Sequence, residues 1–139
     1  MNFFNSKAET LEALSKLNLQ SATILPVVYF SFIEWQENQN QCLNKIRGLN
    51  LSESFIVRSS CKREDSRSSS NAGAFLSLPN ITFKGLTFAI NKVFQSYGDP
   101  NPADQVLIQP NLQDVQCSGV AFSHDPASQA PYRVISWST

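Results

Sequence analysis

Apolar residues recur at helical spacing in three segments of the chain, which predicts three helices. The first is expected at about 7–18, where residues 6–9 (Ser-Lys-Ala-Glu) have the form of a capping box and leucines follow at intervals of three. A second is expected at about 33–47, where a glycine follows. The third, at about 83–97, has the most regular apolar stripe and precedes a Gly-Asp-Pro sequence that predicts its end.

Short apolar or β-branched runs between turn-forming residues predict the strands. Extended segments are expected at 23–26, 28–30, 54–59, 74–78, 105–109, 118–123 and 132–137. The strand at 74–78 should stop at Pro79 and Asn80, because proline cannot donate to a sheet. Helices and strands intermingle without regular βαβ alternation, so the pattern predicts an α+β fold in one domain spanning residues 1–139.

Composition narrows the class of protein. The 139 residues are enough for one domain with a hydrophobic core, and eleven basic residues balance eleven acidic ones. This balance gives no reason to expect nucleic acid or a membrane surface as a partner. No stretch approaches the roughly 20 apolar residues of a membrane helix. Three scattered cysteines and one histidine argue against a disulfide framework or a zinc site, and favour reduced thiols in a cytoplasmic protein.

Candidate chemistry concentrates in residues 54–73, where a buried strand leads into a loop rich in hydroxyl groups and charges. Arg58 would lie at the strand end, where a guanidinium can bind a phosphate through two hydrogen bonds. Alternatively, Arg58 pairs with Glu64 or Asp65. Lys7 would lie in the first turn of its helix, where the helix dipole disfavours a cation unless an anion is bound. Its alternative role is that of a solvated surface lysine.

Three groups of motifs follow one another in a common register. They are Ile-Val-Arg-Ser-Ser at 56–60 with Glu-Asp at 64–65, Ser70 and Ala-Gly at 72–73; Val-Leu-Ile-Gln at 106–109; and Ser-Gly-Val-Ala-Phe at 118–122 with Asp-Pro at 125–126. In order and spacing these motifs resemble the nucleotide-binding domain of phosphoenolpyruvate synthase and pyruvate phosphate dikinase, an ATP-grasp family. The N-terminal segment is similar to a divergent branch of putative sugar-, capsule- or amino-acid-modifying kinases, which includes a glutamine kinase.

The resemblance implies a partial ATP-grasp fold, with residues 1 to about 108 as the first lobe and 109–139 as the hinge and the start of the second. ATP would be bound by two groups of residues. The implied phosphate-binding residues are Arg58, Lys7, Ser70 and Gly73. The implied adenine-binding residues at the hinge are Gln109, Pro110, Asn111 and Leu112. The chain departs from the family at Cys61, where alanine is usual, at Pro110, which lacks an N–H, and around Lys7, where glycines are missing.

The implied activity is ATP-dependent phosphorylation of a small-molecule acceptor, by kinase or dikinase chemistry. In the family, the residues that hold Mg²⁺ lie beyond the Asp-Pro motif, so the Mg²⁺ site is expected outside this chain. The chain is therefore expected to be the N-terminal ATP-binding portion of a longer enzyme, inactive alone. The alternative is a non-catalytic interaction module, in which the exposed edge of the strand at 132–137 pairs with another chain to form a dimer.

Overall fold

The computed structural model describes residues 6–49, 53–61 and 76–139. Its mixture of helices and antiparallel strands confirms the α+β prediction. The helices are α1 (Lys7–Ser15), α2 (Phe32–Glu37), α3 (Gln39–Arg47) and α4 (Leu86–Gln95), with a 3₁₀ turn η1 (Phe83–Gly85) before α4. The strands are β1 (Val28–Ser31), β2 (Phe55–Ser60), β3 (Ser77–Ile81), β4 (Gln105–Pro110), β5 (Ser118–Phe122) and β6 (Val134–Ser138).

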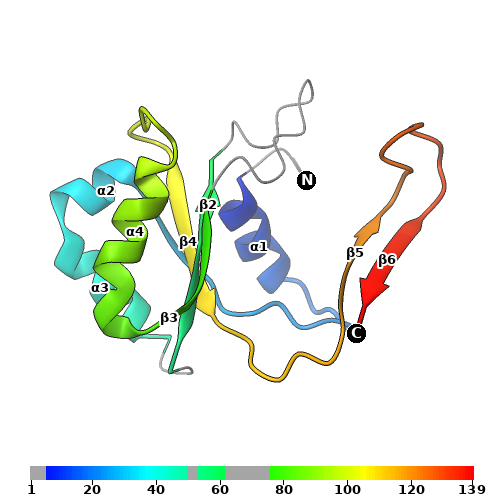
Figure 1. Cartoon of the computed structure of the whole chain (residues 1–139), viewed down its shortest axis with the longest axis horizontal. Helices are drawn as coiled ribbons and strands as arrows, with labels where there is room; N and C mark the ends of the chain where they lie inside the picture. The colour runs from blue at the N-terminus through cyan, green and yellow to red at the C-terminus, as the bar shows by residue number, and fades with distance from the viewer. Residues whose placement is uncertain (1–5, 50–52, 62–75) are drawn as a thin grey trace.

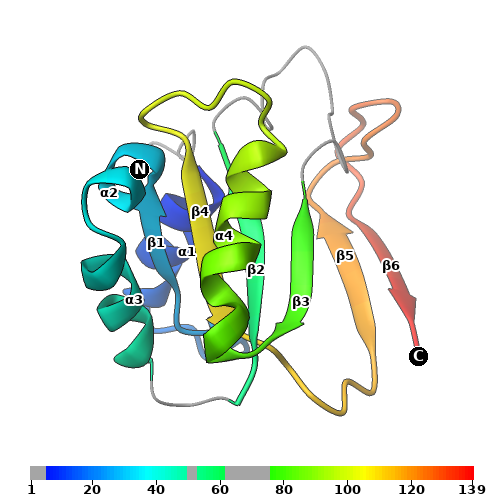
Figure 2. The same ribbon diagram turned by 60° about the vertical axis from the view of Figure 1, so that its left-hand side comes forward.

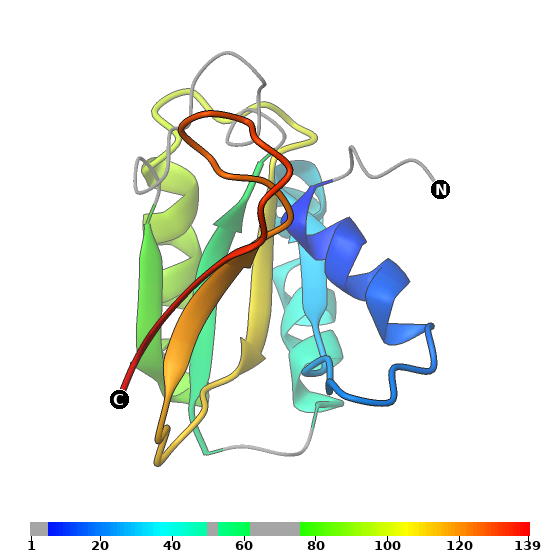
Figure 3. The ribbon, with the colours of Figure 1, turned by 90° about the vertical axis from the view of Figure 1, so that its right-hand side faces the viewer.

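Four strands form one sheet in the order β1-β4-β2-β3, and every neighbouring pair is antiparallel. Helices α2, α3 and α4 cover one face of this sheet, and α1 lies against the other (Figure 1). Figure 2 shows α4 in front of the central strands, with β3 at the edge. Strands β5 and β6 pair only with each other, and their hairpin lies on the α1 side of the sheet (Figures 1 and 3).

The main core lies between the sheet and the α2–α4 layer. Alternate residues of the two central strands point into it, namely Phe55 and Val57 of β2 and Val106 and Ile108 of β4. Helix α4 contributes residues at the helical period: Leu86, Ala89, Ile90, Val93 and Phe94. The apolar stripe that predicted this helix is therefore the face that it buries.

Trp35 joins α2 to α4 within this core. Its ring stacks on Phe30 of β1 with 5.5 Å between centroids, and its Nε1 donates a 2.8 Å hydrogen bond to Oδ1 of Asn91. The buried indole N–H is thus satisfied, as buried polar groups require. None of the helices in the part of the chain described here is both long and apolar enough to cross a membrane.

The helix expected at 33–47 is in fact two helices. Ser31 and Glu34 form a capping box that starts α2 one residue earlier, and Asn38 ends α2 with an extended φ of −153°. The Asn38 side chain accepts a hydrogen bond from the N–H of Gln41 and so caps α3. Asparagine favours caps over helix interiors, and here it breaks a segment whose apolar spacing continues across it.

The expectation that Pro79 and Asn80 stop a strand is wrong, because β3 includes both. Strand β3 is an edge strand that pairs only with β2, and proline is tolerated at an edge. Asn80 has a φ of +58°, and the β2–β3 register shifts between Phe55 and Val57. The irregularity therefore bends the edge strand without ending it. The remaining strands form within a few residues of their expected places, except that 23–26 lies outside the strands.

Tyr97, just after α4, closes the end of the β2–β4 pair. Its hydroxyl accepts a 3.0 Å hydrogen bond from the N–H of Ser60 and donates a 2.6 Å bond to the carbonyl of Gln105. Ser60 and Gln105 are partners in the sheet register, so the phenol bridges the two strands.

Replacing Tyr97 with phenylalanine should lower the free energy of unfolding by about 1–3 kcal/mol, because a buried N–H and a carbonyl both lose their partner. Chemical denaturation monitored by circular dichroism measures the change. Tyr132→Phe, which removes an exposed hydroxyl, is the matched control and should leave stability unchanged. Equal stability of the two variants would show that the bridge contributes nothing.

Candidate functional site

Arg58 lies on the α1 side of the sheet and is exposed. Its neighbour Val57 faces the main core, so the alternation of β2 directs Arg58 to the opposite face. In the register it stands between Leu107 of β4 and Ser77 of β3. Within the described part of the chain, no ion pair or hydrogen bond of its guanidinium is recorded, and the alternative partners Glu64 and Asp65 lie outside that part.

The first turn of α1 is attached to the same face, close to Arg58. The N–H of Ala8 donates a buried 2.9 Å hydrogen bond to Oγ of Ser60. Ser60 follows Arg58 by two residues on one strand, which is a spacing of about 7 Å on one face. Lys7 precedes Ala8 and is half-buried, so its helix turn is attached to the strand that carries Arg58. Of the four predicted phosphate ligands the structure describes Lys7 and Arg58, and the segments that carry them are bonded to each other on one face of the sheet.

A side-chain network reinforces this attachment. The hydroxyl of Ser6, the N-cap of α1, donates to Oε1 of Gln105, and Nε2 of Gln105 donates a 3.2 Å bond to Glu9. Ser6 and Glu9 also complete the predicted capping box. The helix N-terminus is thereby held over the ends of β2 and β4.

Ser70 and Gly73, the other two predicted phosphate ligands, lie outside the described residues. The predicted hinge residues 109–112 begin in β4, where Gln109 and Pro110 are buried. The N–H of Asn111 donates to the carbonyl of Ser54 (3.0 Å), and its side-chain amide donates to Oδ1 of Asn80 (2.8 Å). Asn111 thus extends the sheet, and this use of its N–H leaves fewer hinge donors for an adenine.

One contact that the sequence did not predict holds the middle of α1 on the sheet. The hydroxyl of Tyr29 in β1 donates a 2.6 Å hydrogen bond to Oε2 of Glu12. This bond, with burial, raises the pKa of Tyr29 to about 12. The same bond, together with the charge of Lys16, lowers the pKa of Glu12. The two residues are 17 positions apart, and neither lies in a motif that would indicate the pair.

No group of three or more His, Cys, Asp or Glu side chains that could hold a metal ion occurs within residues 6–49, 53–61 and 76–139. No protein-family model matches the chain, and no curated protein or solved structure shows a significant similarity to it. The resemblance to the ATP-grasp family therefore stays a prediction from the motifs.

The contribution of the Tyr29–Glu12 bond to stability should depend on pH. The folded-state pKa of Tyr29 lies above its ordinary value of 10.0, so the contribution is complete below pH 10.0 and is lost as pH rises through about 12. The folded-state pKa of Glu12 lies below its ordinary value of 4.5. The contribution is therefore also lost in acid, as pH falls below 4.5 and Glu12 becomes protonated.

Unfolding free energies of the unmodified chain and of Tyr29→Phe, measured across this range, should differ most near neutrality and converge towards both limits. Glu12→Gln should lower the pKa of Tyr29 towards 10.0 in a spectrophotometric titration of the phenol. A stability difference that does not change with pH would rule out this coupling.

Proposed function

We propose that this chain is the ATP-binding portion of a phosphoenolpyruvate-synthase-like phosphotransferase, which phosphorylates a small-molecule acceptor. One observation carries the proposal. The hydrogen bond from Ala8 to Ser60 puts Lys7 and Arg58 on the same face of the sheet, although they are 51 positions apart in the printed sequence. The motif resemblance assigns both residues to the phosphates of ATP.

The chemistry of this face suits a polyphosphate. A guanidinium on a sheet strand is held in place by the strand and can bind phosphate through two parallel hydrogen bonds. The N-terminus of α1, with its partial positive charge, lies beside it over Ser60 and favours an anion there. Lys7 adds a second full positive charge in the same turn.

The position of the β5–β6 hairpin also agrees with the proposal. The hairpin lies on the α1 side of the sheet (Figures 1 and 3). Arg58 faces the same side, because Val57 before it faces the main core. In the proposed ATP-grasp arrangement, the hairpin begins the second lobe, and the nucleotide lies between the two lobes. Residues 109–112 then form the hinge.

Among the described residues, no group of three or more His, Cys, Asp or Glu side chains could hold a metal ion, and we expect the Mg²⁺ site that phosphoryl transfer requires to lie outside this chain. The carboxylates of α1 are engaged elsewhere: Glu9 accepts from Gln105, and Glu12 accepts from Tyr29. Our proposal therefore covers ATP binding by this chain and assigns it no phosphoryl-transfer step.

Arg58→Ala should weaken ATP binding at least about tenfold, because hydrogen bonds to charged groups contribute roughly 1.5–3 kcal/mol. Isothermal titration with ATP in the presence of Mg²⁺ measures the affinity. Arg47→Ala removes an exposed arginine of α3, on the opposite face of the sheet, and serves as the control with unchanged affinity. The proposal fails if the unmodified chain does not bind ATP, or if the two variants bind it equally.

The exposed hairpin favours a second candidate, an interaction module that dimerises through a strand edge. Ile135 and Trp137 are each 70% exposed and share one face of β6. Two strands alone are marginally stable in water, and their free edges can pair with another chain. In this case a second copy would add strands to the hairpin and cover Trp137.

Gly119 allows a test of this candidate, since it lies opposite Trp137 where the strands approach closely. A Cβ at position 119 would lie 2.4 Å from the carbonyl oxygen of Ser136, so Gly119→Val should open the hairpin and abolish a dimer. Gly85→Ala is the control, because its Cβ would meet only an ordinary 3.4 Å contact. Sedimentation velocity measures the dimer, and a monomeric unmodified chain would exclude this candidate.

A further inference from the structure

Cationic side chains cluster on part of the helix layer that covers one face of the sheet. Residues 38–49 and 76–98 contain four cationic and no acidic side chains, although the whole chain has eleven of each sign. The four are Lys45, Arg47, Lys84 and Lys92, and all are exposed. They belong to α3, η1 and α4, while α2 in the same helix layer carries the acidic Glu34 and Glu37 (Figure 1). Only Lys45 has an acidic partner in the described part of the chain, Glu34 of α2 at 3.5 Å.

Aromatic rings lie among these cations. Phe88 is 71% exposed on α4, with Lys84 four residues before it and Lys92 four residues after it. Nζ of Lys92 is 5.6 Å from the Phe88 ring centroid, and the Arg47 guanidinium is 4.8 Å from the Phe83 ring centroid. We name Arg47, Phe83, Lys84, Phe88 and Lys92 the basic aromatic face. Such a surface attracts an anionic partner and also offers it apolar contact.

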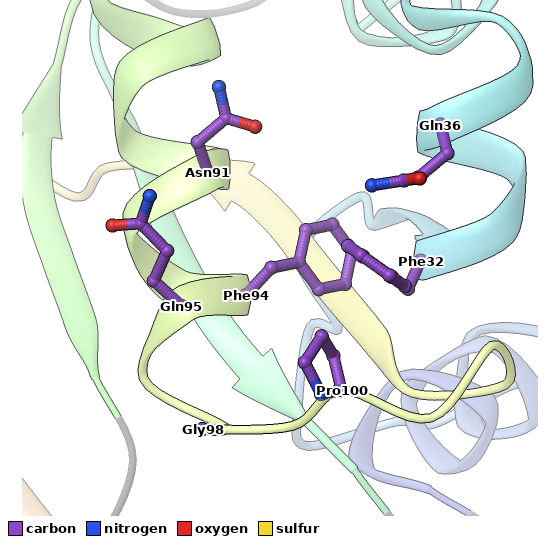
Figure 4. A pocket seen from close by; sticks show the side chains of 7 residues that line it. All are labelled: Phe32, Gln36, Asn91, Phe94, Gln95, Gly98 and Pro100. Carbon is purple, nitrogen blue, oxygen red and sulfur yellow. The ribbon is translucent and has the colours of Figure 1, made fainter.

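A pocket of about 240 Å³ opens between α2 and α4 (Figure 4). The rings of Phe32 and Phe94 meet edge to face at 5.1 Å between centroids. Three amide side chains, from Gln36, Asn91 and Gln95, also line the pocket, together with Gly98 and Pro100. Figure 4 shows Gln36 extending from α2 towards α4 above the rings. The lining carries no charged side chain, so its occupant there should be neutral.

The pocket and the basic aromatic face are continuous. Asn91 and Gln95 follow Phe88 by three and seven residues, which is the spacing of one helix face. A ligand that lies along α4 can therefore contact the cations and the pocket together. Asp99 follows Gly98 beyond the end of α4 and would repel an acidic group there. The acidic part of the ligand should then lie towards the Lys84 end.

We propose that this surface binds an acidic peptide segment of a partner protein. Its carboxylates pair with Lys84 and Lys92, and one apolar side chain enters the pocket over Phe32 and Phe94. The amides favour a peptide over other polyanions, because they donate and accept hydrogen bonds as peptide groups do. The absence of charge from the pocket lining likewise fits an apolar side chain better than a phosphate. This site is separate from the proposed ATP site.

Trp35 supplies a reporter, since its Nε1 is bonded to Asn91 in the pocket lining. Trp137→Phe leaves Trp35 as the single tryptophan of the chain. In this background, a peptide of alternating glutamates with one central leucine should change the Trp35 emission saturably. The same peptide with glutamine in place of glutamate should bind much more weakly. Added salt should lower the affinity of the acidic peptide, because it screens the ion pairs.

Lys92→Gln should lower the affinity for the acidic peptide about threefold to fivefold, as expected for the loss of one exposed ion pair. Lys16→Gln removes another exposed lysine, at the C-cap of α1, and should leave the affinity unchanged. Phe88→Ala should reduce affinity further, and because Phe88 is exposed the variant should fold normally, which circular dichroism checks. The proposal is overturned if no acidic peptide binds, if Lys16→Gln is equivalent to Lys92→Gln, or if a single-stranded oligonucleotide or anionic vesicles bind in preference to the peptide.

Discussion

The paired residues Ser60 and Gln105, at the end of the β2–β4 ladder, connect all three layers of the domain. From the α4 side, the Tyr97 hydroxyl bonds to the N–H of one and the carbonyl of the other. From the opposite side, the N–H of Ala8 bonds to the Ser60 hydroxyl, and Ser6 bonds to the Gln105 amide. Ser60 is fully buried, so these polar groups depend on one another for their hydrogen bonds.

This constraint explains why α1 leaves Arg58 exposed. Helix α1 bonds to Ser60 and Gln105 at its N-terminus and to Tyr29 near its middle. It therefore crosses its face of the sheet towards β4 and β1. Arg58 lies outside the area that α1 covers, on β2 between β4 and the edge strand β3. The same attachment that places a positively charged helix end near Arg58 therefore leaves its guanidinium accessible. The proposed phosphate site depends on both effects.

The two sides of the sheet then differ in character. The side of α1 carries polar bonds between side chains, and the proposed nucleotide site lies there. The side of α4 carries the apolar core, and its outer surface presents cations, Phe88 and an uncharged pocket. Because the total charge is balanced, the clustering of cations on α3, η1 and α4 is invisible in the composition and emerges only when these elements are placed beside one another. The two proposed binding surfaces can therefore act independently.

The sequence by itself determined the features that depend on neighbouring residues. The capping box at Ser6 and the apolar stripe of α4 each involve residues within one or two helical turns, and both formed as predicted. Arg58 was expected at a strand end, but β2 continues through the buried Ser59 and Ser60, so Arg58 lies within the strand. The break at Asn38 was missed because the apolar period continues through it.

Tertiary structure alone decided which distant residues meet. Ala8 and Ser60 are 52 positions apart, and Tyr29 and Glu12 are 17 apart, so no local pattern could pair them. The edge position that lets β3 include Pro79 likewise depends on the strand order of the whole sheet. The local sequence specifies whether a segment forms a helix or a strand. Where that element packs depends on how all the elements together bury their apolar surfaces.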